Sequence, residues 1–135
     1  MKNNNLLEVP NINSKDAKLK KLIYDVDESL FYEDNYSNEE FEHLCVCSGG
    51  TTSSCAKNGF TTLDLRKNYS KIHLDRKTNL VTIGGGVIMG DLLNHLQKHK
   101  RSFPIGLSKL PGAGYILTGG VSPLSRAYGL SLIHI

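Results

Sequence analysis

The sequence predicts an α+β domain of small mixed sheets with flanking helices, and three observations support this class. Short apolar segments with alternating polarity recur from residue 41 onward, as in β-strands. Residues 87–100 instead carry apolar side chains at helical spacing. Segments rich in glycine and small residues, at 48–53 and 111–120, separate these elements. A chain of 135 residues has room for one such domain.

Residues 1–40 are expected to form an N-terminal extension with a short helix. Ser14 is a suitable N-cap for this helix, because its hydroxyl can accept a hydrogen bond from a first-turn N–H. Leu19, Leu22 and Ile23 recur at helical spacing and would lie on its buried side.

Short strands are expected next. The first covers residues 41–47 and the second residues 61–65. Residues 72–74 and 80–83 are expected to form a hairpin around the polar link DRKTN. Three glycines, Gly84–Gly86, then indicate a tight turn from strand to helix.

The helix expected at 87–100 is amphipathic. Its buried face carries Ile88, Met89, Leu92, Leu93 and Leu96. Basic residues at 98–101 suit the negative pole of the helix, so that cluster requires no ligand. His95 and His99 have a spacing compatible with a metal, but no third ligand is nearby in the sequence. We therefore expect a solvated helix face and no metal site.

Cysteine usage points to packing rather than to disulfides or zinc. Alternation places Cys45 and Cys47 on one face of the expected strand, where cysteine behaves as a small hydrophobe. With Cys55 the number of cysteines is odd, and no CxxC pair is present.

Composition narrows the class of function. Hydrophobic residues make up 39% and charged residues 21%, and no apolar run is long enough to span a bilayer. The N-terminus lacks the features of a signal peptide, so a cytoplasmic location is expected. Residues 44–135 hold eleven basic and three acidic residues, a balance that suits an anionic ligand. Nucleic acid is not expected as a partner, because no arginine-rich helix or aromatic RNA-binding signature is present.

Two glycine-containing segments carry the functional question. CVCSGGTTSSC, at 45–55, reads either as a surface turn or as a cradle for an anion formed by backbone N–H groups and hydroxyls. PGAGYILTGG, at 111–120, suggests backbone lying close against another group. Neither segment has the spacing of a G-x-G-x-x-G dinucleotide loop, and no GK[ST] Walker sequence follows Gly84–Gly86.

The order of these segments resembles the FAD-binding domain of the FAD-linked oxidase family. The resemblance rests on SGGTTSS, then LDL, a hairpin ending in IGGGV, MGDLLNHL, and PGAGYILTGGVSPLSRAYGL. This is the PCMH-type, vanillyl-alcohol-oxidase-like fold, which includes the berberine-bridge-like enzymes. The resemblance implies a partial, C-terminally truncated domain over residues 41–129. Residues 130–135, LSLIHI, resemble a translated sequencing adapter and are expected to be an artefact.

In that family the first loop wraps the FAD pyrophosphate, and the second lies along the pyrophosphate and the flavin. The resemblance implies that the residues at the matching positions of this sequence bind the cofactor: Ser48, Gly49, Gly50, Thr51, Thr52, Ser53, Gly112, Ala113, Gly114, Thr118, Gly119, Gly120 and Ser122.

Two departures from the family pattern concern attachment of the flavin. Thr51 stands where many members carry a histidine covalently linked to the flavin, and no cysteine occurs after Cys55. Non-covalent FAD is therefore expected. The family's usual catalytic base lies beyond the matching segment, so no catalytic residue is assigned.

The resemblance implies an FAD-dependent oxidoreductase that transfers hydride from a C–H or alcohol-type small molecule to the flavin. Two alternatives stay open from the sequence. The 135-residue chain could be a truncated, non-catalytic fragment that is inactive by itself. It could also be a nucleotide- or phosphate-binding module without redox activity.

Overall fold

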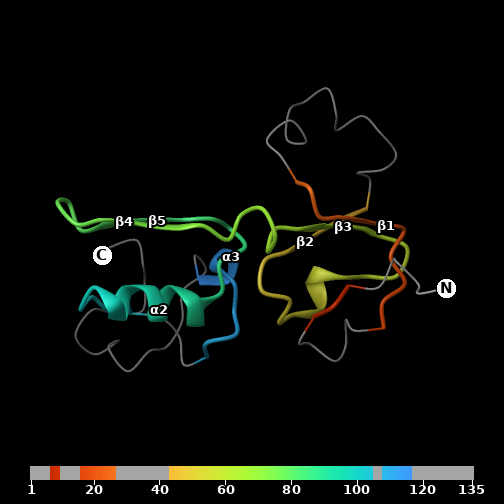
Figure 1. Cartoon of the computed structure of the whole chain (residues 1–135). Coiled ribbons are helices and arrows are strands. Elements are labelled where there is room, and N and C mark those ends of the chain that lie inside the picture. Colours follow the sequence, from red (N-terminus) through yellow and green to blue (C-terminus); the bar gives the residue numbers. More distant parts are fainter. Residues whose placement is uncertain (1–6, 10–15, 27–42, 105–107, 117–135) are drawn as a thin grey trace.

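The computed structural model of the chain describes residues 7–9, 16–26, 43–104 and 108–116. These residues form a three-stranded sheet and a two-stranded sheet that lie side by side (Figure 1). The strands are β1 (Lys21–Ile23), β2 (Leu44–Cys47), β3 (Thr61–Asp64), β4 (Ile72–Asp75) and β5 (Leu80–Ile83). The helices are the 3₁₀ helix η3 (Ser53–Cys55), α2 (Met89–Lys98) and the short α3 (Ala113–Ile116). Small sheets with flanking helices are thus confirmed.

The three-stranded sheet is parallel and has the order β1-β3-β2. Thr61 of β3 is in register with Lys21 on one side and Leu44 on the other. All four residues of β3 are buried, as expected for the central strand of a covered parallel sheet. Because the strands are parallel, their carboxyl ends share one edge, and the segment that begins at Ser48 leaves from that edge.

The N-terminal helix expected between Ser14 and Tyr24 is not present in the described residues, because Lys21–Ile23 form β1. The spacing of Leu19, Leu22 and Ile23 fits a helix, but a helix of this length gains little stability by itself. Pairing with the edge of β3 satisfies the backbone of β1 instead, and Leu19 still becomes buried. The segment expected to be an extension therefore adds a strand to the sheet.

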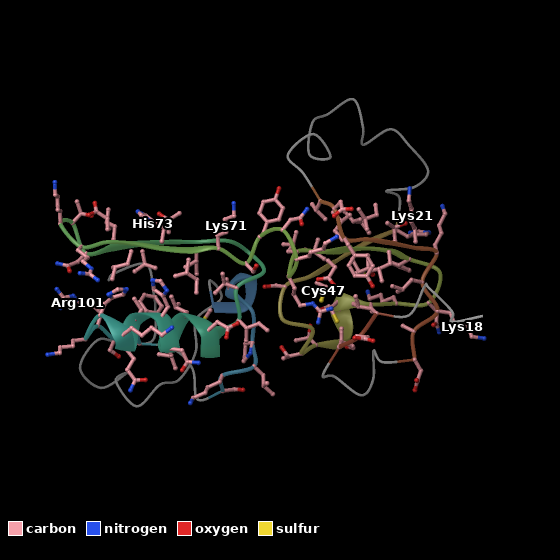
Figure 2. The ribbon with its side chains drawn as sticks, viewed as in Figure 1. Lys18, Lys21, Cys47, Lys71, His73 and Arg101 are labelled. Atoms are coloured by element: carbon pink, nitrogen blue, oxygen red, sulfur yellow. The ribbon has the colours of Figure 1, made fainter. Side chains whose placement is uncertain are left out.

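The core beneath this sheet confirms the expected role of the cysteines. Cys45 and Cys47 are buried while Val46 between them is 48% exposed, so the two thiols share one face of β2. Cys47, Cys55 and Ala56 pack in one hydrophobic cluster with four residues from the N-terminal part of the chain: Leu7, Val9, Ala17 and Leu19. All three cysteines are free thiols. Figure 2 shows Cys47 pointing from the sheet toward η3.

The second sheet is the expected hairpin, with Ile72 opposite Ile83 and Asp75 opposite Leu80. Its apolar face covers α2, and His73 points away from the helix into solvent (Figure 2). Met89, Leu92 and Leu96 form the buried face of α2, as predicted, while Leu93 is partly buried. No helix in the described ranges is long and apolar enough to cross a membrane.

The turn predicted at Gly84–Gly86 joins the hairpin to α2, and it packs closely against the end of the first sheet. The Gly86 N–H donates to the Tyr69 carbonyl at 2.9 Å. A Cβ on Gly86 would lie 2.8 Å from the Arg66 Cα, and one on Gly84 would lie 3.0 Å from the Tyr69 Cα. These glycines permit close approach of one backbone to another, which confirms the turn.

Candidate functional site

Three glycine-containing segments that are distant in the sequence meet between the two sheets. We call this meeting point the glycine junction and define it as Ser48–Gly50, Gly84–Gly86 and Gly112–Gly114. The first segment follows the carboxyl end of β2, the second precedes α2, and the third opens α3. Ligands commonly bind outside the carboxyl ends of parallel strands, so the location is suitable for a binding site.

Gly49 and Gly112 touch through their backbones. A Cβ on Gly49 would lie 2.9 Å from the Gly112 Cα, and a Cβ on Gly112 would lie 2.6 Å from the carbonyl carbon of Ser48. Neither position has room for a side chain, because backbone lies on both sides. The glycine density noted in the sequence is therefore explained, at these two positions, by contact between the two segments.

The third segment is also held by α2. Gly112 forms an antiparallel bridge with Ile88. The Met89 N–H donates to the Pro111 carbonyl at 3.0 Å, and the Ala113 N–H donates to the Val87 carbonyl at 2.8 Å. The start of α3 is thus fixed on one side by the entry to α2 and on the other by Gly49.

Ser48 links all three segments with one hydroxyl. Its Oγ donates a short hydrogen bond to the Gly85 carbonyl oxygen. The same Oγ accepts a hydrogen bond from the Gly114 N–H at 3.2 Å. A serine hydroxyl has a single proton to donate. Ser48 therefore uses that proton within the protein.

Gly49 and Gly50 supply the backbone N–H groups that an anion would require. Both residues are buried, and neither N–H donates a hydrogen bond within the described part of the chain. Buried N–H groups are nearly always paired, so these two are candidate donors to an acceptor outside the described residues. Gly50 has φ 69°, a left-handed conformation that glycine adopts without strain.

The other predicted residues of the first loop are arranged differently. Thr51 and Thr52 are half-buried, and the Thr52 hydroxyl lies 2.6 Å from that of Ser54. Ser53 is exposed and lines a separate hollow of about 430 Å³ that also contacts Lys57 and Asp16. Of the second loop, Ala113 is buried in the core beside α2. Thr118, Gly119, Gly120, Ser122 and residues 130–135 lie outside the described residues.

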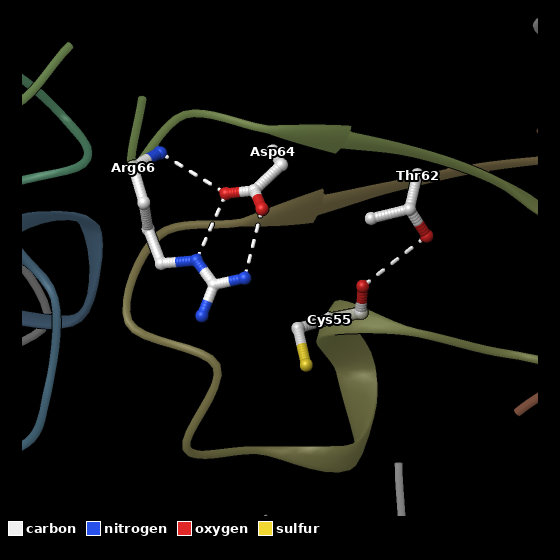
Figure 3. Close-up of polar contacts among 4 residues, drawn as sticks. All are labelled: Cys55, Thr62, Asp64 and Arg66. Atoms are coloured by element: carbon white, nitrogen blue, oxygen red, sulfur yellow. Dashed lines mark hydrogen bonds and ion pairs between the residues drawn. The ribbon is translucent and has the colours of Figure 1, made fainter. Parts of the chain in front are cut away.

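An ion pair at the end of β3 was not predicted from the sequence. The Asp64 carboxylate accepts hydrogen bonds from the Arg66 backbone N–H at 3.1 Å, from Nε at 2.9 Å and from Nη2 at 2.8 Å (Figure 3). The Asp64 side chain is 4% exposed and that of Arg66 is 25% exposed. The hydrogen bond to Asp64 raises the pKa of Arg66. The spacing Asp-x-Arg at a strand end was the only available signal in the sequence.

The part of the sequence that contains the glycine junction has few carboxylates. Only Asp64, Asp75 and Asp91 occur after residue 43. Asp64 is neutralised by Arg66, Asp75 accepts hydrogen bonds within the hairpin turn, and Asp91 is exposed in the first turn of α2. Burial raises the pKa of the Cys47 thiol to about 12, so this thiol is neutral as well. Among the described residues, the one buried carboxylate is therefore paired with a cation.

Comparison with known proteins gives the family. The sequence pattern of the FAD binding domain family matches residues 35–135, which is more than half of the chain. The chain belongs to this family.

Known relatives of this FAD-binding domain are oxidoreductases. It is 36% identical over 95 residues to the FAD-linked oxidoreductase nodO of Hypoxylon pulicicidum, covering 68% of this chain and 21% of that protein. It is 35% identical over 103 residues to (R)-6-hydroxynicotine oxidase of Paenarthrobacter nicotinovorans, covering 74% of this chain and 22% of that protein. The chain thus spans about a fifth of the length of these relatives.

Solved structures confirm the predicted PCMH-type fold. The crystal structure of 6-hydroxy-D-nicotine oxidase from Arthrobacter nicotinovorans matches with a TM-score of 0.61 and 35% identity, over 65% of this chain and 20% of that one. A berberine bridge enzyme variant matches with a TM-score of 0.57 and 25% identity, over 65% of this chain and 19% of that one. The FAD-binding domain described here is therefore a part of that fold.

The residues present fit the phosphate part of FAD. The N–H groups of the buried residues Gly49 and Gly50 have no acceptor within the described ranges, and they match the need of a pyrophosphate for oriented donors. The close contact between Gly49 and Gly112 brings the first and second loops to one place. Asp64, the buried carboxylate among the described residues, is paired with Arg66, which lessens electrostatic opposition to an anion.

Proposed function

We propose that the glycine junction is part of the FAD cradle of an FAD-dependent oxidoreductase. The observation that carries the proposal is the convergence of the two loops at Gly49 and Gly112. Beside it, the N–H groups of Gly49 and Gly50 donate to no other described residue. These backbone donors would hold phosphate oxygens without a lysine. The thirteen residues that the family resemblance implies remain our assignment for cofactor contacts, and for Ser48 the assignment concerns its backbone.

The proposed reaction is transfer of hydride from a C–H or alcohol-type small molecule. Bound flavin supplies the hydride-accepting chemistry, and the protein supplies position and field. The described residues contribute binding rather than proton transfer. The names of the relatives support oxidation of small molecules, and nothing in the described geometry favours a phosphate-binding module without redox chemistry.

We further propose that the flavin is held without a covalent bond. Thr51 occupies the position where many family members carry the linking histidine. His43 lies at the opposite end of β2, where its ring stacks on Phe60 with centroids 4.9 Å apart. The three cysteines are buried, and a neutral buried thiol is a poor nucleophile.

The purified full-length protein that contains this domain tests both proposals. We expect a yellow preparation with a flavin absorbance spectrum, and acid precipitation should release the flavin into the supernatant. A colourless protein that does not take up added FAD would contradict the cradle. Flavin that stays with the acid pellet would contradict non-covalent binding only.

A further inference from the structure

Ser48 has a special place in the glycine junction because its hydroxyl contacts each of the other two segments. Only the hydroxyl can make both contacts, since the Ser48 Oγ donates to the Gly85 carbonyl and accepts from the Gly114 N–H at 3.2 Å. These partners lie 37 and 66 residues away in the sequence.

The Gly114 N–H is one of the first-turn donors of α3, which have no acceptor inside the helix. A serine, threonine, aspartate or asparagine just before a helix commonly supplies this acceptor. Here the residues before α3 are Pro111 and Gly112, which have no polar side chain. Ser48 supplies the missing acceptor from the first loop instead.

The direction of the two hydrogen bonds decides what Ser48 can do for a ligand. Its proton is used on the Gly85 carbonyl, which can only accept. The hydroxyl then has no proton to offer a phosphate oxygen, which is also only an acceptor. A direct phosphate contact through this hydroxyl would require both existing hydrogen bonds to be rearranged.

We propose that Ser48 is a positioning residue that couples the two cofactor loops, and that it acts on the cofactor through them. The hydroxyl fixes the first loop against the Gly84–Gly86 turn and against the start of α3. Gly49 and Gly50, the next residues in the chain, are thereby held with their N–H groups in place. This inference rests on the proposed FAD cradle for its effect on binding, but not for the contact itself.

The test compares Ser48→Ala, Ser48→Thr and the exposed control Ser70→Ala in the full-length protein. Hydrogen-exchange mass spectrometry of the flavin-free protein follows peptides that cover residues 108–116. We expect Ser48→Ala to speed exchange there by about tenfold, because the Gly114 N–H loses its acceptor. Ser48→Thr keeps the hydroxyl and should exchange like the wild type, as should Ser70→Ala.

FAD titration of the same proteins gives the second readout. Ser48→Ala should raise the dissociation constant of FAD by about tenfold, and Ser48→Thr should restore most of the affinity. Weaker FAD binding by Ser48→Ala with unchanged exchange at 108–116 would overturn the proposal in favour of direct phosphate contact. Unchanged exchange and unchanged affinity would also overturn it. A wild type that does not bind FAD would count against the cradle, while exchange in the flavin-free protein would still decide the contact.

Discussion

The contact between Gly49 and Gly112 predicts opposite effects for two alanine substitutions only two residues apart. In Gly112→Ala the new Cβ would lie 2.6 Å from the Ser48 carbonyl carbon, and the atoms it meets include backbone that cannot rotate away. In Gly114→Ala the nearest atoms are the Ser48 Cβ and Oγ, both at 3.5 Å, which is ordinary van der Waals contact. Comparing the two variants therefore distinguishes the effect of a steric clash at Gly112 from the general effect of replacing a glycine by alanine.

The magnitude follows from these contacts. Overpacking costs about 1–3 kcal/mol when side chains can adjust, and more when they cannot. Displacing Ser48 would also weaken its two hydrogen bonds, at about 1 kcal/mol each. We expect Gly112→Ala to destabilise the junction by about 3–5 kcal/mol. Gly114→Ala should be neutral, or stabilising by up to about 1 kcal/mol, because alanine favours the helical conformation of α3.

Native-state hydrogen exchange of the full-length protein measures this difference locally. Peptides covering residues 43–50 and 108–116 report the free energy of opening of the junction. Gly112→Ala should lower that free energy, and Gly114→Ala should leave it unchanged or higher. Equal effects of the two substitutions would refute the reasoning, because the distances that distinguish them would then have no consequence.

Two further predictions concern the end of β3 and the core below it. Asp64→Asn should cost about 2–4 kcal/mol in unfolding free energy, below the full cost of breaking a buried pair because the Arg66 side chain is 25% exposed. The control Asp25→Asn removes an ion pair between Asp25 and Lys67, whose side chains are 80% and 62% exposed, and it should cost less than about 1 kcal/mol. Urea unfolding measures the loss of unfolding free energy in both variants, and equal losses would contradict the burial argument. Burial raises the pKa of Cys47 from 9.0 to about 12, so between these values the unfolded chain loses a proton that the folded chain keeps, and stability falls as pH rises. Over that pH range, Cys47→Ala should reduce the slope of unfolding free energy against pH by up to about 1.4 kcal/mol per pH unit. An unchanged slope would show that the thiol is not responsible.

Local patterns in the sequence were sufficient for most elements. Alternation at Ile72, Leu74, Val81 and Ile83 predicted the hairpin, because one face of it packs on a helix. Helical spacing predicted α2 for the same reason. The pattern before residue 24 was misleading, since the partner that makes β1 a strand is β3, and such pairing is not visible in a short window of sequence.

The site was predictable as a set of loops but not as a set of contacts. The glycine density at 111–120 indicated close approach of backbone to another group, yet only the fold shows that Gly112 approaches Gly49. Likewise, Ser48 was predicted as a donor to phosphate because hydroxyls commonly fill that role. Its actual partners, Gly85 and Gly114, come from distant segments that the fold brings together.

The most direct test of the FAD cradle is titration of the flavin-free full-length protein with FAD, comparing Gly50→Val with Gly59→Val. Both glycines have left-handed backbone, with φ 69° at Gly50 and φ 76° at Gly59, so valine introduces similar strain of about 1–3 kcal/mol at each. Gly59 lies before β3, at the opposite edge of the sheet, with nothing within 4 Å of a new Cβ. Our account predicts that, in folded protein, Gly50→Val raises the dissociation constant of FAD at least about thirtyfold, since a cost of 2 kcal/mol or more is expected. Gly59→Val should bind FAD like the wild type. Unchanged affinity in folded Gly50→Val would contradict the central claim.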